Sequence, residues 1–440
     1  RARESIELNT VSGTADTFVN RSRIDNSTEF QAFGASGEIE IETSVLNLQN
    51  RAFIGTANRT IATGTSNTVT GSGIGDINIT AFEAITLASD SNLGSFSLFE
   101  GLTGGGDITI NTKQLRVLDG IISLLSLGKN DSNRLMITAR DSVDVIGDRS
   151  YVIAGPQRGS TSSAELILRT EDLRIADGAT VGASPDLTQE NGEAENSGTI
   201  TIEATSINLS NQASLLSAPF FPAASGNAGG LNITATEDIS VVGDSQISVS
   251  SLIEGRNAGD LTISANSLLL DQGGLISAES SGGDQGNINL MLNDFLLLRR
   301  GGSITTNAIE ASTGGNIEIT VPFIIAIPNE NSDIVANAVQ GSGGNIQITA
   351  TDIFGIQFRS HVTPLSDITA SSQFGVNGLV QIQTSDLSPS QGTVKLPSDL
   401  TDASNQISTE CLVAADSSFV LTGRGGLPGT PRSLDGSRGW

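Results

Sequence analysis

Carboxylates that recur at one position of a repeated motif are the residues in this chain whose spacing could support catalysis. Asp76 and Asp107 each follow a glycine and precede an apolar–polar–apolar stretch, and Asp260 holds the same place further along the chain. Carboxylates brought together on adjacent coils could act as acid and base in the cleavage of a polysaccharide. Aspartate also forms turns at such positions, whatever the function. We therefore predict turn-forming aspartates and keep a polysaccharide lyase or hydrolase as the alternative.

The single histidine, His361, raises a second kind of chemistry. Asp352 and Asp367 lie near it in the sequence, so a hydrolytic triad could be drawn around it. A serine hydrolase of that kind also needs a nucleophile elbow, G-x-S-x-G at a strand-to-helix turn, and the sequence has none. A lone histidine in a strand-like segment is more often structural or exposed. We therefore predict no catalytic role for His361.

Two further features bear on ion binding and redox chemistry. The acidic stretch 189–196 contains Glu190, Glu193 and Glu195, which could hold Ca²⁺ together with backbone oxygens. It lacks the alternation of an EF-hand loop, and we predict a solvated loop.

Cys411 is the only cysteine, which excludes an internal disulfide and a cysteine-based metal site. We expect an inert thiol, with an intermolecular bridge as the alternative, and we predict no catalytic, cofactor or metal site.

One short motif positions most of these residues: a glycine, then Asp or Asn, then Ile-x-Ile. The clearest copies are Gly314–Thr320 and Gly344–Thr349. Successive copies lie roughly 27 to 38 residues apart, a period typical of stacked-repeat folds. About thirteen copies begin near residues 4, 37, 75, 106, 133, 164, 198, 229, 259, 286, 315, 344 and 378.

Each copy has the alternation of a half-buried β-strand. Ile39 and Ile41, for example, flank the polar Glu40, and residues two apart lie on the same face of a strand. We expect the preceding glycine to supply the positive φ that a sharp turn needs. A single strand of this kind cannot bury its apolar face, so we expect successive copies to stack and form continuous aliphatic columns.

The rest of each repeat has room for more strands. Residues 115–123 and 268–278 have the pattern of a second strand, an Asp or Gly turn and a third short strand. Three strands in roughly 30 residues describe one coil of a parallel β-helix. We therefore predict an all-β, right-handed, single-stranded parallel β-helix of about thirteen coils over residues 1–384, followed by a less regular tail, residues 385–440.

Asparagine recurs at one turn position in the most regular part of the chain. Asn287, Asn316 and Asn345 each follow the glycine of three successive repeats. Side-chain amides stacked in register can donate to and accept from one another along a fibre or a solenoid. We therefore predict an amide ladder at these three positions.

Composition excludes several classes of partner. The formal net charge of −25 disfavours nucleic acid and anionic membranes. Arg299 and Arg300 form one basic pair, which we expect to be solvated.

The longest apolar run, 321–328, contains two prolines, so we expect no transmembrane segment. The sequence opens without a methionine or a signal peptide, and we expect it to be a piece of a longer protein.

The tail carries a resemblance to a known family. Cys411 and the segment Ser417–Pro428 resemble the C-terminal signature of large cyanobacterial exoproteins. These belong to the filamentous-haemagglutinin-like, two-partner-secretion family, often called S-layer family proteins, and the Gly-Asn-Ile-x-Ile-Thr-Ala repeats are similar to their repeat region. The resemblance implies secretion through an outer-membrane β-barrel transporter and an extracellular or cell-surface role such as adhesion. The N-terminal secretion domain that defines the family is not in this sequence, as a fragment would explain.

We therefore predict a non-enzymatic, structural or adhesive exoprotein that presents loops on a rigid rod, with glycans or cell surfaces as partners. Two alternatives stay open. One is a carbohydrate-active enzyme, which would need three or more carboxylates converging across adjacent coils and aromatic platforms for sugar rings. Aromatic residues make up 4% of the chain, which provides few such platforms. The other alternative is an inert stalk for a functional domain outside this sequence.

Overall fold

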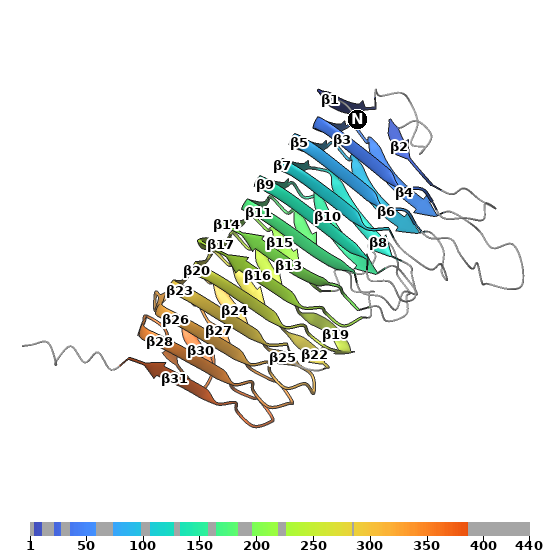
Figure 1. The fold of residues 1–440 in the computed structure, drawn as a ribbon. Coiled ribbons are helices and arrows are strands. Elements are labelled where there is room, and N and C mark those ends of the chain that lie inside the picture. The colour runs from blue at the N-terminus through green and yellow to red at the C-terminus, as the bar shows by residue number, and fades with distance from the viewer. Residues whose placement is uncertain are drawn as a thin grey trace, which may run out of the picture. The chain divides into compact units, whose positions relative to one another are not determined.

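All the secondary structure of the described residues is β-strand, and the strands pair in parallel. Coils of about 30 residues stack on one another and form a β-solenoid, as predicted (Figure 1). The structure is a computed structural model. It describes residues 4–10, 22–27, 36–58, 74–97, 106–126, 133–156, 164–183, 196–218, 226–283 and 286–385.

The first sheet runs the length of the stack, with thirteen described strands along its hydrogen-bonded path. Each of them begins one or two residues after a predicted repeat start, so the predicted repeat starts are confirmed. The strands are β1 (Ser5–Asn9), β3 (Ile39–Gln49), β5 (Ile77–Ala88), β7 (Ile108–Leu118), β9 (Arg134–Ile146), β11 (Glu165–Ala176), β13 (Thr199–Ala204), β16 (Leu231–Ala235), β20 (Leu261–Asp271), β23 (Ile288–Leu298), β26 (Ile317–Ala326), β28 (Ile346–Phe354) and β31 (Val380–Thr384).

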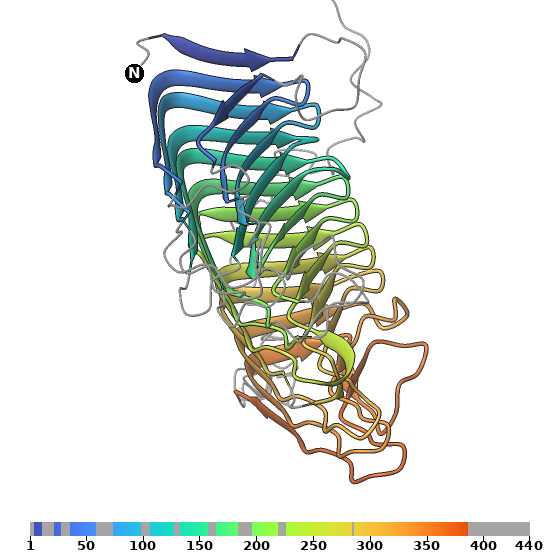
Figure 2. The same ribbon diagram turned by 90° about the vertical axis from the view of Figure 1, so that its right-hand side faces the viewer.

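Most strands of the first sheet are long because they continue through a bend (Figure 2). In β7 the buried side chains are Ile108 and Ile110, then Leu115 and Val117, so the alternation changes phase in between. The register with β9 shifts after Thr112, which is the mark of a β-bulge. We call the residues before the bulge the near arm and those after it the far arm.

The prediction of three separate strands per coil is therefore wrong for most coils. The predicted second strand is the far arm of the first, because backbone hydrogen bonds continue on both sides of the bulge. In two coils the far arm is a separate strand, β14 (Ser206–Ser210) or β17 (Asp238–Val242), and these two strands pair with the far arms of their neighbours.

The predicted third strand forms a second sheet, which follows a tight turn in each coil. A third sheet of short strands is confined to three coils. The second sheet contains β2 (Arg23–Asp25), β4 (Phe53–Asn58), β6 (Asn92–Ser97), β8 (Ile121–Ser126), β10 (Tyr151–Pro156), β12 (Thr180–Gly182), β15 (Ser214–Leu216), β18 (Gln246–Ser248), β21 (Leu275–Ser277), β24 (Ser303–Thr305), β27 (Ile334–Val335), β30 (Asp367–Thr369) and β29 (Gln357–Phe358), and the third contains β19 (Ser251–Arg256), β22 (Ser280–Gly282) and β25 (Ala308–Ile309).

Aliphatic columns fill the space between the sheets. Because coils pair in register, each inward side chain contacts its equivalent one coil away, and burying one such side chain contributes roughly 1.5–3 kcal/mol. From β4 to β30 one column of the second sheet has no exposed surface: Ile54, Leu93, Ile122, Val152, Val181, Leu215, Ile247, Ile276, Ile304, Ile334 and Ile368.

Glycine opens most repeats because the preceding coil leaves no room for a side chain. A Cβ on Gly75 would lie 2.2 Å from the carbonyl oxygen of Gly37, and a Cβ on Gly315 would lie 1.7 Å from that of Gly286. None of these four glycines has a positive φ. The prediction that the repeat-start glycines supply a left-handed turn is therefore wrong: they allow close approach between coils.

Left-handed residues lie instead at the turn between the far arm and the second sheet. Asp119, Asp177 and Asp244 have φ values of 52°, 57° and 56° there, and Gly178 has 83°. Aspartate and asparagine tolerate this conformation better than other residues with a Cβ. This explains the Asp or Gly turn that the sequence shows after the far arms within residues 115–123 and 268–278.

Several predictions fall on residues that the structure does not describe. These are the tail from residue 386 onward with Cys411, and the acidic loop with Glu190, Glu193 and Glu195. The expected boundary between the repeats and the tail, and the roles expected for this thiol and this loop, stay predictions.

We predict that Gly229→Ala destabilises the solenoid and that Gly230→Ala does not. A Cβ at Gly229 would lie 1.9 Å from the carbonyl oxygen of Gly198, whereas at Gly230 the nearest atom is 3.7 Å away. Overpacking against backbone should lower the free energy of unfolding by roughly 1–3 kcal/mol. Urea denaturation followed by circular dichroism measures this. Equal midpoints for the two variants would contradict the close-approach explanation.

Candidate functional site

The candidate catalytic carboxylates of the repeat-start turns are engaged by the next coil. Asp76 Oδ1 accepts a hydrogen bond of 2.9 Å from the backbone N–H of Asp107, and Asp107 Oδ1 accepts one of 2.8 Å from that of Arg134. Asp76 and Asp107 lie one coil apart, as predicted, just before the paired residues Ile77 and Ile108. Their oxygens therefore link coil to coil, and the aspartates have the geometry of turn residues.

The amide ladder predicted for the later repeats is confirmed, and it extends beyond the three asparagines. Asn316 donates from both its backbone N and its Nδ2 to Asn287 Oδ1, at 3.0 and 3.1 Å. Asn287 makes the same two bonds to Asp260. At the other end, Asn345 N donates to Asn316 Oδ1, and Leu379 N donates to Asn345 Oδ1. Aspartate and asparagine are therefore equivalent as acceptors at this turn.

A second asparagine ladder was not predicted. Asn227 N donates to Asn196 Oδ1 at 3.1 Å, and Asn257 N donates to Asn227 Oδ1 at 2.9 Å. The three residues are separated by 31 and 30 positions. Their spacing at the repeat period was a usable signal, but they lie just before the glycine, outside the motif used to align the repeats.

His361 is not part of a triad with either aspartate. Its Nδ1 lies 3.1 Å from Ser360 Oγ, and both side chains are exposed. Asp367 is fully buried and forms an ion pair with Arg359. Asp352 is exposed and accepts a 2.8 Å bond from the next backbone N–H. None of the hydrogen bonds among the described residues joins His361 to either aspartate, so this arrangement lacks the orienting carboxylate that a general-base histidine requires.

A buried pair of carboxylates lies nearby, at the end of the second sheet. Asp333 is 7% exposed, and its Oδ1 accepts a 2.8 Å bond from the backbone N–H of Asp367. Burial raises the pKa of Asp333 above its ordinary value, and the charge of Asp367 adds to that effect, although the N–H bond opposes it. Arg359 lies against Asp367 and compensates its charge. The ion pair between Arg359 and Asp367 fixes the segment that precedes β30 onto the sheet.

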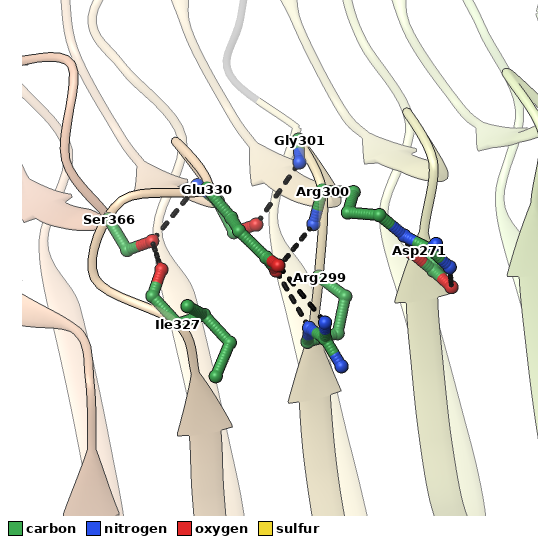
Figure 3. Close-up of polar contacts among 8 residues, drawn as sticks. Asp271, Arg299, Arg300, Gly301, Ile327, Glu330 and Ser366 are labelled. Carbon is green, nitrogen blue, oxygen red and sulfur yellow. Dashed lines mark hydrogen bonds and ion pairs between the residues drawn. The ribbon is translucent and has the colours of Figure 1, made fainter.

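Arg299 and Arg300 are not simply solvated, and the prediction for this pair is wrong. Arg299 binds Glu330 of the next coil through two bonds of 2.7 and 3.0 Å, and the backbone N–H of Arg300 donates to the same carboxylate at 2.9 Å (Figure 3). The Arg300 side chain turns the other way and binds Asp271 of the preceding coil, with Nε 2.8 Å from Oδ1. The two arginines therefore tie three coils together through bidentate pairs.

These ion pairs lower the pKa values of both carboxylates. The hydrogen bond from Arg299, followed by that from the backbone of Arg300, lowers the pKa of Glu330 to about 2. The Arg300 side chain lowers the pKa of Asp271 in the same way. Both carboxylates therefore stay ionised well below neutral pH, and the turn carries matched rather than free charge.

The third sheet borders an open groove of about 740 Å³. Its lining is small and polar: Gly255, Asn257, Gly282, Gly283, Ala311, Ser312 and Thr313. Gly282 N donates to Ser312 Oγ at 3.0 Å, so part of this polar surface is already satisfied. No carboxylate, histidine or lysine lines the groove, which leaves hydrogen bonding as its chemistry. Over the whole described part, no group of three or more His, Cys, Asp or Glu residues is arranged to hold a metal ion.

No protein-family model, curated protein or solved structure matches this chain. The resemblance to filamentous-haemagglutinin-like exoproteins therefore remains a hypothesis based on the repeat and tail residues. The described residues form no helix with the length and apolarity that a bilayer crossing requires.

We predict that Asn316→Ala breaks the amide ladder at two points. The backbone N–H of Asn345 loses its acceptor, and Asn287 Oδ1 loses one of its donors. The loss should reduce the free energy of unfolding by about 1–2 kcal/mol. Urea denaturation measures it, with Asn232→Ala, on the exposed face of β16, as the control expected within about 0.5 kcal/mol of wild type. Equal losses in both variants would show that the ladder adds nothing.

Glu330→Gln should destabilise the protein at neutral pH and have a smaller effect in acid. The pKa of Glu330 is lower in the folded chain, about 2 against an ordinary 4.5, so its contribution is present above 4.5 and is lost as the pH falls towards 2. The difference in urea midpoint between variant and wild type should shrink over that interval. Glu318→Gln, exposed on the same coil, is the control for the substitution itself. A difference between Glu330→Gln and wild type that stays constant down to pH 2 would contradict the prediction.

Proposed function

We propose that this protein is a non-enzymatic structural or adhesive protein whose β-solenoid holds interaction surfaces along a rod. The observation that carries the proposal is the continuous ladder: thirteen described strands pair in one path, and side chains at the repeat turns extend the pairing between coils. A stack of this kind is rigid, and equivalent outward residues of successive coils lie in register along it. A β-solenoid rod fits a structural or adhesive role.

An extracellular or cell-surface location, with export through an outer-membrane two-partner-secretion transporter, belongs to the same proposal. Its support is the resemblance of Ser417–Pro428 and of the repeats to that family. The high negative charge supports partners other than nucleic acid or anionic membranes. Glycans and cell surfaces are the partners that this proposal names.

The engagement of Asp76 and Asp107 supports the non-enzymatic function over a carbohydrate-active enzyme. A catalytic acid or base must have an oxygen within reach of the substrate proton that it moves. One oxygen of each aspartate is instead bonded to the backbone of the next coil. The hypothesis of an enzyme and the hypothesis of an inert stalk each predict a different experimental result.

A glycan-array screen beside a polysaccharide-depolymerisation assay, each with and without Ca²⁺, separates the three functions. We expect glycan binding without release of shorter products. Product release that disappears in Asp76→Asn or Asp107→Asn would make the protein an enzyme, with Asp260→Asn as the control at the same turn of a distant coil. The absence of both glycan binding and product release would favour the inert stalk.

A further inference from the structure

One outward-facing column changes character abruptly along the stack. It runs through the far arms of the first sheet, where each residue pairs with its equivalent on the next coil. The first eight described members are polar or charged, and the last four are apolar. In order they are Glu7, Asn47, Thr86, Arg116, Asp144, Arg174, Asn208, Ser240, Leu269, Leu297, Ile325 and Phe354.

Two phenylalanines enlarge the apolar part of this column. Phe295 and Phe323 pair with each other on adjacent coils, two residues before Leu297 and Ile325 and therefore on the same face. Phe323 is 38% exposed and Phe354 49%. The alternate residues, such as Leu296 and Ile324, are fully buried, so the phenylalanines point outward. We call the set Leu269, Phe295, Leu297, Phe323, Ile325 and Phe354 the apolar patch.

The charges beside the apolar patch are neutralised or negative. Arg299 and Arg300, which follow it, are paired with Glu330 and Asp271. The exposed Asp352 lies beside Phe323, in register with it on the next coil. An anionic ligand would therefore find no free cation among these neighbours and would meet a carboxylate. The chain's net charge of −25 acts in the same direction.

The size of the patch decides against a second copy of the chain. Four coils and two residues along each arm cover roughly 250 Å², whereas a stable interface needs roughly 800 Å² from each partner. An apolar peptide fits no better. The backbone groups of the sheet beneath are already paired, so a peptide lying on this face would find no partners there for its own N–H and C=O groups.

We propose that the apolar patch is a stacking platform for a neutral polysaccharide chain. A sugar ring has an apolar face of C–H groups and a rim of hydroxyls, so it can cover the phenylalanine rings while its hydroxyls remain in water. In-register phenylalanines on successive coils place platforms in a line along the solenoid. This inference rests on the proposed adhesive function and names the class of glycan and the surface that it contacts.

Affinity electrophoresis tests the inference with the full chain, run through gels that contain hydroxyethylcellulose, xyloglucan, starch or alginate. The variant is Phe295→Thr with Phe323→Thr, because threonine is β-branched and favourable on the outer face of a strand. The control is Phe82→Thr, because Phe82 is 53% exposed at the bend of β5, far along the stack from the patch. Urea midpoints of both variants should match wild type.

We expect at least one neutral polysaccharide to retard the wild-type chain, the double variant to lose tenfold or more in affinity, and the control to keep it. Retardation that the double variant retains would overturn the patch and leave the adhesive function standing. Retardation by alginate alone would do the same. No binding to these polymers or to the glycan array would overturn both the patch and the adhesive function, and would favour the inert stalk. A dimer in light scattering that the double variant abolishes would assign the patch to a second copy instead.

Discussion

The parallel backbone ladder between coils is the constraint on which the rest of this structure depends. Adjacent coils are spaced at about 4.8 Å by their hydrogen bonds, and every residue must accept a neighbour at that distance above and below it. At most repeat starts the distance is so short that a Cβ would clash with the preceding carbonyl: a Cβ on Gly259 would lie 1.9 Å from Gly229 O. The glycine, rather than the aliphatic residues, is therefore the position with the strictest requirement.

The same ladder determines what the polar residues do. Once coils are in register, a side-chain oxygen in a turn lies next to the backbone N–H of its equivalent one coil away. Asp76 and Asn287 satisfy that N–H, at 2.9 and 3.0 Å. The aspartates that could have been catalytic, Asp76 and Asp107, therefore have a structural role because of their position. Stacking in register also brings Arg299 next to Glu330 of the following coil. The ladder thus removes free polar groups from the turns and leaves the outer face of the strands to vary.

The outer face is where function could diverge without cost to the fold. Its side chains point away from the core, so Ser240 can be followed by Leu269 and Leu297 without disturbing Val241, Leu270 and Leu298 behind them, all fully buried. Large apolar side chains that are exposed together can mark an interaction surface. The exposure of Phe323 and Phe354 on adjacent coils meets that description.

The sequence by itself determined the solenoid, the start of each coil and the asparagine ladder, because a strict period places equivalent residues on top of one another before any coordinates are known. It could not show that the near and far arms form one bent strand, since a bulge changes the phase of the alternation and looks like a break. It also assigned the wrong reason to the repeat-start glycines, because close approach by another coil leaves no local trace. Only the tertiary structure decided that Arg299 meets Glu330 and that Phe295 meets Phe323: neither pair shares a motif, and the register across coils alone brings each together.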